Sequence, residues 1–167
     1  VELAIEQSDL IIFTVDSSQD ITDSDREISQ MLRKINKPII IAANKVDTPE
    51  KSDYIHNFYS LGFDNLLPIS AYHNLGIDDL INESFNYLDH TNDDNKKNDS
   101  IRVAISGRPN VGKSALFNSI IDSKRSIVSE VAGTTRDMID YELIYKEKKL
   151  TFLDTAGLRK RGKIENG

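Results

Sequence analysis

The chain has 167 residues, of which 38% are hydrophobic and 29% charged, and it contains no cysteine. Its net charge of −6 is uneven: residues 1–100 hold 8 basic and 19 acidic side chains (−11), and residues 101–167 hold 13 and 8 (+5). This composition excludes disulfides, thiolate metal sites and a membrane-spanning helix, and the acidic first part argues against DNA as a partner.

The first predicted elements are a strand, a helix and a second strand. The apolar runs 10–15 and 38–43 are typical of strands buried on both faces of a sheet. Between them, apolar residues recur at helical spacing over 28–35. Thr22 and Asp25 have the spacing of a capping box, which places the start of this helix.

A similar alternation continues through the next forty residues. Thr48 is a candidate cap for a helix over 49–60, and Gly62 ends it. A short strand is expected at 66–69, followed by an amphipathic helix after Gly76. The β-α-β-α-β-α order predicts an α/β fold with a parallel, doubly wound sheet.

Residues 91–100 contain no apolar side chain, which predicts a flexible polar linker. A strand over 101–106 and a helix over 115–121 follow. The alternating residues of 139–145 and the run 150–153 predict a hairpin. We therefore expect a mostly parallel sheet with one antiparallel hairpin.

The segment between the strand at 101–106 and the next helix has the pattern of a phosphate-binding P-loop. Glycines at both ends let consecutive N–H groups face the phosphates, and the helix N-terminus favours anions. Lys113 can contact the β and γ phosphates, and the Ser114 hydroxyl can ligate Mg²⁺. The predicted nucleotide-binding residues of this loop are Gly107, Arg108, Pro109, Asn110, Val111, Gly112, Lys113 and Ser114.

A second phosphate-side motif follows the last predicted strand. Asp154 can hold Mg²⁺ through water, and the Gly157 N–H can bind the γ-phosphate. Upstream, 132–137 suits a switch loop in which Thr135, preferred over Thr134, completes the Mg²⁺ shell; a plain turn is the alternative. The predicted site residues here are Asp154, Thr155, Ala156, Gly157 and Leu158.

A motif suited to reading guanine occurs much earlier, at the carboxyl end of the strand over 38–43. It consists of Asn44, Lys45, Val46 and Asp47. The Asp47 carboxylate can accept from N1–H and the exocyclic N2 of guanine, a donor pair that adenine lacks. Lys45 would pack its stem over the ring. The backbone of Ser70 and Ala71, after the next strand, fits a loop that contacts the guanine oxygen.

These motifs resemble those of the Der (EngA) family of bacterial double GTPases, in the TrmE-Era-EngA-like group. Residues 1–90 resemble the C-terminal half of a first G domain, 91–100 the acidic linker, and 101–167 the N-terminal half of a second G domain. The resemblance implies GTP and GDP as ligands and Mg²⁺ as cofactor, and the absence of cysteine fits a cytoplasmic location. It also implies GTP hydrolysis coupled to maturation of the large ribosomal subunit or its rRNA in the full-length protein.

Two residues refine the expected chemistry. Leu158 stands where Ras-like enzymes carry a water-positioning glutamine, so hydrolysis by this chain alone is expected to be slow or absent. By resemblance to potassium-stimulated members of the group, Asn110 is expected to ligate K⁺.

The order of the motifs leaves three hypotheses open, because the base-reading motif ordinarily follows the two phosphate motifs. The chain is a fragment of a Der-like GTPase with two half-sites, an intact circularly permuted GTPase with one composite site, or a non-catalytic phosphate-binding interaction fragment. We expect the halves to close into one pseudo-permuted P-loop NTPase domain, although a swapped dimer would satisfy the same surfaces. The expected strand order is 139–145, 150–153, 101–106, 10–15, 38–43, 66–69.

Overall fold

The computed structural model describes residues 2–90, 100–122, 127–132, 139–145, 148–155 and 158. The strands are β1 (Leu10–Asp16), β2 (Ile39–Asn44), β3 (Leu66–Pro68), β4 (Ser100–Ser106), β5 (Ile127–Ala132), β6 (Ile139–Tyr145) and β7 (Lys148–Phe152). The helices are α1 (Glu2–Gln7), α2 (Asp23–Leu32), the 3-10 helix η1 (Pro49–Leu61), α3 (Ile77–His90) and α4 (Lys113–Asp122).

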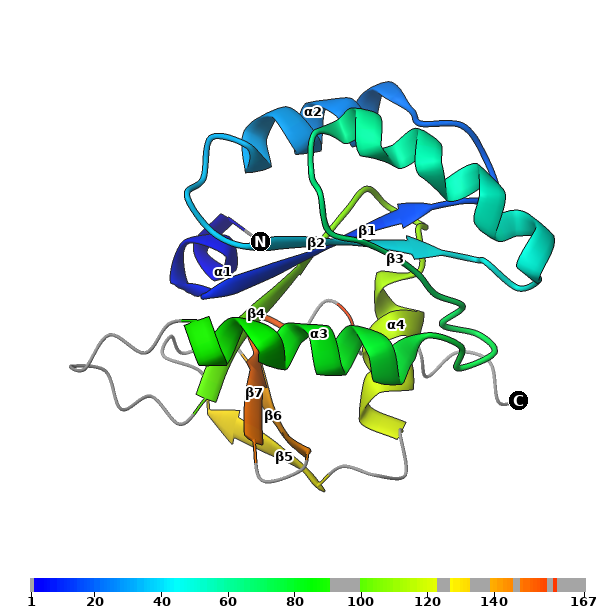
Figure 1. Ribbon diagram of the computed structural model, residues 1–167. Helices are drawn as coiled ribbons and strands as arrows, with labels where there is room; N and C mark the ends of the chain where they lie inside the picture. Colours follow the sequence, from blue (N-terminus) through cyan, green and yellow to red (C-terminus); the bar gives the residue numbers. More distant parts are fainter. Residues whose placement is uncertain are drawn as a thin grey trace.

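The described strands form one seven-stranded sheet in the order β3-β2-β1-β4-β7-β6-β5 (Figure 1). β4 lies parallel to β1, with Leu10 opposite Val103 and Phe13 opposite Ser106. This pairing confirms that the halves of the chain share one sheet, and the six predicted strands have the predicted order. The predicted β6–β7 hairpin is present.

Four details differ from the sequence-based expectation. β5 was not predicted; it pairs antiparallel with β6 and adds a second antiparallel pairing at the edge of the sheet. α1 was not predicted either. Ser100 belongs to β4 rather than to the linker, whose residues 91–99 lie outside the described part of the chain. The helix after Thr48 is a 3-10 helix, and the Thr48 side chain makes no capping hydrogen bond.

The start of α2 agrees with the prediction. The Asp25 N–H donates to Thr22 Oγ1 at 3.3 Å, and the Thr22 N–H donates to Asp25 Oδ2 at 3.1 Å. This reciprocal capping box satisfies backbone donors that the helix itself cannot pair. It also fixes the Asp25 carboxylate at the N-terminal end of α2.

Helices cover both faces of the sheet, as Figure 1 shows for α2 on one side and α3 and α4 on the other. β1 is buried along its whole length because its side chains alternate between these faces. Leu10 and Ile12 join the core under α3 and α4, and Ile11 and Phe13 join the core under α1, α2 and η1.

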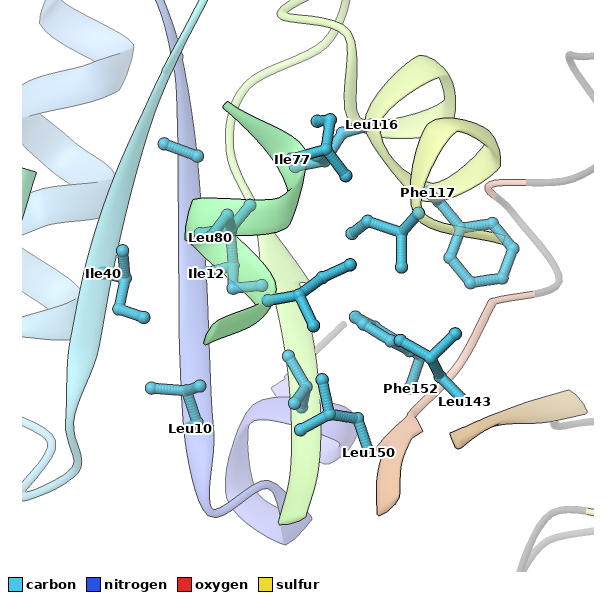
Figure 2. Packing of buried hydrophobic residues seen from close by; sticks show 14 of the residues in the cluster. Leu10, Ile12, Ile40, Ile77, Leu80, Leu116, Phe117, Leu143, Leu150 and Phe152 are labelled. Atoms are coloured by element: carbon cyan, nitrogen blue, oxygen red, sulfur yellow. The ribbon is translucent and has the colours of Figure 1, made fainter. Parts of the chain in front are cut away.

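One of these cores crosses the boundary between the halves (Figure 2). Leu80 of α3 and Leu10 of β1 belong to the same buried cluster as Leu116 and Phe117 of α4. The Phe117 ring also makes an edge contact with Phe152, with centroids 5.9 Å apart. Separating the halves would expose this apolar surface, which is why they pack together. In the described part of the chain, no helix is long and apolar enough to cross a membrane.

An ion pair fixes the register between the starts of β1 and β4. Arg102 donates from Nη2 to Asp9 Oδ1 at 2.8 Å, and from Nε and its backbone N–H to Asp9 Oδ2 at 3.0 Å. Burial opposes ionisation of Asp9, but the hydrogen bonds and the charge of Arg102 outweigh it, so the pKa of Asp9 lies below its usual 3.8.

The Asp9 pair gives stability a pH dependence whose sign is defined. A lowered folded-state pKa stabilises the fold above pH 3.8, and this stabilisation is lost as pH falls through the folded pKa. Asp9→Asn should therefore unfold at lower urea than wild type at pH 7, and the difference should shrink below pH 3.8. Urea titrations at pH 7 and pH 3 measure it, with the exposed Asp64→Asn as control. A difference independent of pH would contradict the pair's role.

Candidate functional site

The P-loop connects β4 to α4 and closes around its own lysine. Lys113 Nζ donates to the carbonyl oxygens of Gly107 and Arg108, each at 2.8 Å. α4 begins at Lys113, earlier than the predicted start at Ala115, so the helix N-terminus faces the loop directly. The ammonium group therefore lies where the loop and the helix dipole both favour an anion.

A cavity of about 520 Å³ lies beside this loop. Lys113, Ser114, Asp154 and Leu158 line it, together with Pro109, Asn110, Gly112, Ala4, Ala104, Ile105 and Leu153. Ser114 and Asp154 thus line one cavity, and hydroxyl and carboxylate oxygens are the hard donors that suit Mg²⁺. The Asp154 backbone adopts φ 52°, and its N–H donates to Asp140 Oδ1 at 3.2 Å.

Asn44, at the end of β2, joins the base-reading motif to the P-loop. Its Nδ2 donates to the Val111 carbonyl oxygen at 2.8 Å, and its Oδ1 accepts from the Ala71 N–H at 3.0 Å. Asn44 is 3% exposed, so both hydrogen bonds are shielded from water. One side chain therefore holds together a strand end from the first half, a loop from the first half and the P-loop from the second.

Asp47 and Ser70 are also adjacent. Ser70 Oγ donates to Asp47 Oδ1 at 2.7 Å, and Ser70 is fully buried. This hydrogen bond orients the carboxylate from one side. The predicted guanine-side residues thus form one cluster at the carboxyl ends of β2 and β3.

Lys45 has a partner that sequence reasoning did not single out. Its Nζ lies 2.6 Å from Asp16 Oδ2, at the end of β1, and its backbone adopts φ 73°. Burial disfavours the Asp16 charge, but hydrogen bonds from Lys45, Ser18 and Gln19 lower its pKa to about 2. Asp16 is therefore ionised at neutral pH and holds the Lys45 ammonium group at the end of β1. The position of Asp16 at the end of a buried strand was the available signal.

Some of the remaining predicted site residues are buried and support the site, and others lie outside the described part of the chain. Val46 and Val111 are buried at 8% and 0% exposure and pack in the interior. Thr155 is buried, and its Oγ1 donates to the Ile139 carbonyl oxygen at 2.7 Å, so it anchors the Asp154 turn. Ala156, Gly157, Thr134, Thr135 and the basic run 159–163 lie outside the described residues.

Comparison with known proteins identifies two GTP-binding segments in tandem. Residues 1–90 match the family model described as the elongation factor Tu GTP binding domain. Residues 102–167 match the one described as a 50S ribosome-binding GTPase. The fold resembles that of YjeQ from Thermotoga maritima, with a TM-score of 0.54 and 20% identity over 92% of this chain and 50% of that one.

Curated relatives named GTPase Der match almost the whole chain. Those of Staphylococcus carnosus and Brevibacillus brevis are each 48% identical over 163 residues, and that of Oceanobacillus iheyensis is 42% identical. Each match covers 98% of this chain and 37% of the relative, so the chain spans little more than a third of their length. The chain carries a P-loop and a base-reading motif in one sheet, and with 42–48% identity to these relatives over 98% of its length it belongs to the Der family.

Proposed function

We propose that this chain binds GTP and GDP in one composite pocket, formed by the base-reading motif of residues 1–90 and the P-loop of residues 101–167. In this proposal the two segments are the C-terminal half of one G domain and the N-terminal half of the next, joined by the polar linker 91–99. The observation that carries it is the buried hydrogen bond from Asn44 to the Val111 carbonyl oxygen. This hydrogen bond joins a side chain of one half to the P-loop of the other, which supports a single site for base and phosphate contacts.

The base contact can be tested by inverting its hydrogen-bonding pattern. In Asp47→Asn an amide replaces the carboxylate that accepts from N1–H and N2 of guanine. The affinity for GTP should fall and that for xanthosine triphosphate should rise, giving a change in preference of about 100-fold or more. Equilibrium titration with fluorescent analogues of both nucleotides measures it.

The control for this exchange is Asp64→Asn, an exposed carboxylate outside the site. It should keep the wild-type preference for GTP. If Asp47→Asn also keeps that preference, the base-reading motif and the P-loop do not serve one nucleotide.

In this proposal, the phosphate side of the pocket carries the chemistry. Lys113 would contact the β and γ phosphates, and Ser114 and Asp154, with Thr135, would hold Mg²⁺, which neutralises phosphate charge when bound. The family description of residues 102–167 as a 50S ribosome-binding GTPase supports a large-subunit partner. We extend the proposal to a cytoplasmic protein that contacts this subunit or its rRNA.

The rate of hydrolysis should be low. Leu158 lines the phosphate cavity and packs against the apolar core, so this position offers no group that orients water. Turnover by the chain alone is expected on the order of 10⁻³ s⁻¹ or below. Phosphate release measured under single-turnover conditions tests this, and rapid hydrolysis would contradict it.

Potassium should accelerate whatever hydrolysis occurs. Asn110 lines the cavity with a backbone φ of 66°, at the turn of the P-loop, and offers a carbonyl oxygen. Rates in K⁺ should exceed those in Na⁺, and Asn110→Ala should remove the difference. Asn57→Ala, on η1, is the control that should keep it. Equal rates in both salts with the wild-type chain would exclude a potassium site.

A further inference from the structure

We propose that Asp25, at the start of α2, positions the P-loop for phosphate binding by holding Arg108. This inference rests on the proposed nucleotide site and names a residue that acts on it from outside the nucleotide motifs. Asp25 and Arg108 are 83 residues apart in the sequence and belong to different halves of the chain.

The contact between them is buried. Arg108 Nε lies 3.2 Å from Asp25 Oδ2, and the two side chains are 15% and 2% exposed. The same oxygen accepts from Thr22 Oγ1 at 2.7 Å and from the Thr22 N–H at 3.1 Å. The capping box therefore holds the Asp25 carboxylate in place independently of Arg108. The start of α2 serves as the fixed partner to which Arg108 binds.

Arg108 connects this anchor to the P-loop lysine. Its side chain bonds Asp25, and its own carbonyl oxygen accepts from Lys113 Nζ at 2.8 Å. A displacement of Arg108 would therefore move one of the two carbonyl groups that hold the ammonium in place. Phosphate binding depends on the orientation of the Lys113 ammonium and of the loop N–H groups. Asp25 therefore affects the phosphate site through Arg108.

The pair is also incompletely bonded. Asp25 Oδ1 and Arg108 Nη2 are buried and have no hydrogen-bond partner among the described residues. Arginine and carboxylate pair most strongly when two parallel hydrogen bonds form. The second of these two hydrogen bonds is absent from this contact.

The test removes the ion pair and keeps the capping box and the side-chain volumes. Asp25→Asn retains an oxygen for Thr22, and Arg108→Met retains the aliphatic stem. The double variant D25N/R108M avoids leaving one charge buried alone. The matched control is D9N/R102M, which removes another ion pair between the halves, at the opposite end of β4 from the P-loop.

Pyrophosphate and GDP are the probes, because pyrophosphate reports on the P-loop without the base. D25N/R108M should bind both about tenfold more weakly than wild type, the size of effect seen for residues that support a ligand-binding group. Its preference for GTP over xanthosine triphosphate should not change. D9N/R102M should lose thermal stability and bind pyrophosphate as wild type does.

Wild-type pyrophosphate affinity in D25N/R108M would overturn the positioning role, and the Asp47→Asn exchange would still decide the composite pocket. If wild type binds pyrophosphate but not GDP, the composite pocket fails and the variant still decides the role of Asp25. If wild type binds neither, both ideas fall. Should the double variant not fold, Arg108→Lys replaces it: weaker pyrophosphate binding supports the role, and unchanged binding overturns it.

Discussion

Replacing Lys113 by Ala is expected to abolish most of the affinity for GTP and GDP, with a loss of at least about 100-fold. The Lys113 ammonium lies between the carbonyl oxygens of Gly107 and Arg108, at the N-terminus of α4. A bound phosphate would meet this charge and the helix dipole together, and Ala removes the stronger of the two. Titration of a fluorescent GTP analogue measures the loss.

A charge-matched control separates this effect from a change in net charge. Lys34→Ala removes one exposed positive charge after α2 and should bind GTP as wild type does. Thermal unfolding of both variants checks that they remain folded. Wild-type GTP affinity in Lys113→Ala would remove the P-loop from the nucleotide site.

Structural features that depend on short-range sequence patterns were predicted well. The runs 10–15 and 38–43 lie on β1 and β2 because a strand buried on both faces needs apolar residues at every position. The capping box at Thr22 has a short-range pattern and forms as expected. The position of the P-loop between a strand and a helix follows from its glycines and its flanking apolar runs.

Side-chain contacts between distant residues were missed, although the strand pairing that joins the two halves was predicted. Arg108 pairs with Asp25 across 83 residues and Lys45 pairs with Asp16 across 29, and no local sequence pattern matches either residue to its partner. β5 is an edge strand that pairs with β6, and the sequence pattern did not predict it. The 3-10 geometry of η1 was also missed, since the spacing of apolar residues does not distinguish it from an α-helix.

Despite the reversed motif order, the sheet topology places the base-reading motif and the P-loop at the same edge of the sheet. β1 pairs with β2 on one side and with β4 on the other, all in parallel. Ligands of parallel α/β sheets bind beyond the carboxyl ends of the strands, where β2 ends at Asn44 and β4 leads into the P-loop. Adjacency in the sheet, rather than order in the chain, brings the motifs together.

Replacing Gly112 by Ala should damage both folding and nucleotide binding. Gly112 has φ +98°, and a Cβ there would lie 2.2 Å from Asn44 Nδ2. Asn44 cannot turn away without breaking its buried hydrogen bonds to Val111 and Ala71. Lost hydrogen bonds and a strained backbone should lower the free energy of unfolding by about 2–4 kcal/mol. GTP affinity should fall by at least about 100-fold, because the contact that joins the two motifs is lost.

Gly62→Ala is the matched control, since Gly62 has a similar φ of +86°. Its Cβ would meet only the side chain of Arg33, at 3.0 Å, and this exposed arginine can move aside. The cost should be the backbone strain alone, about 1–2 kcal/mol, with GTP affinity unchanged. Urea unfolding and GTP titration of both variants measure the comparison. If Gly112→Ala loses no more stability than Gly62→Ala and binds GTP normally, Asn44 is not confined against the P-loop, and the composite pocket lacks the contact on which it depends.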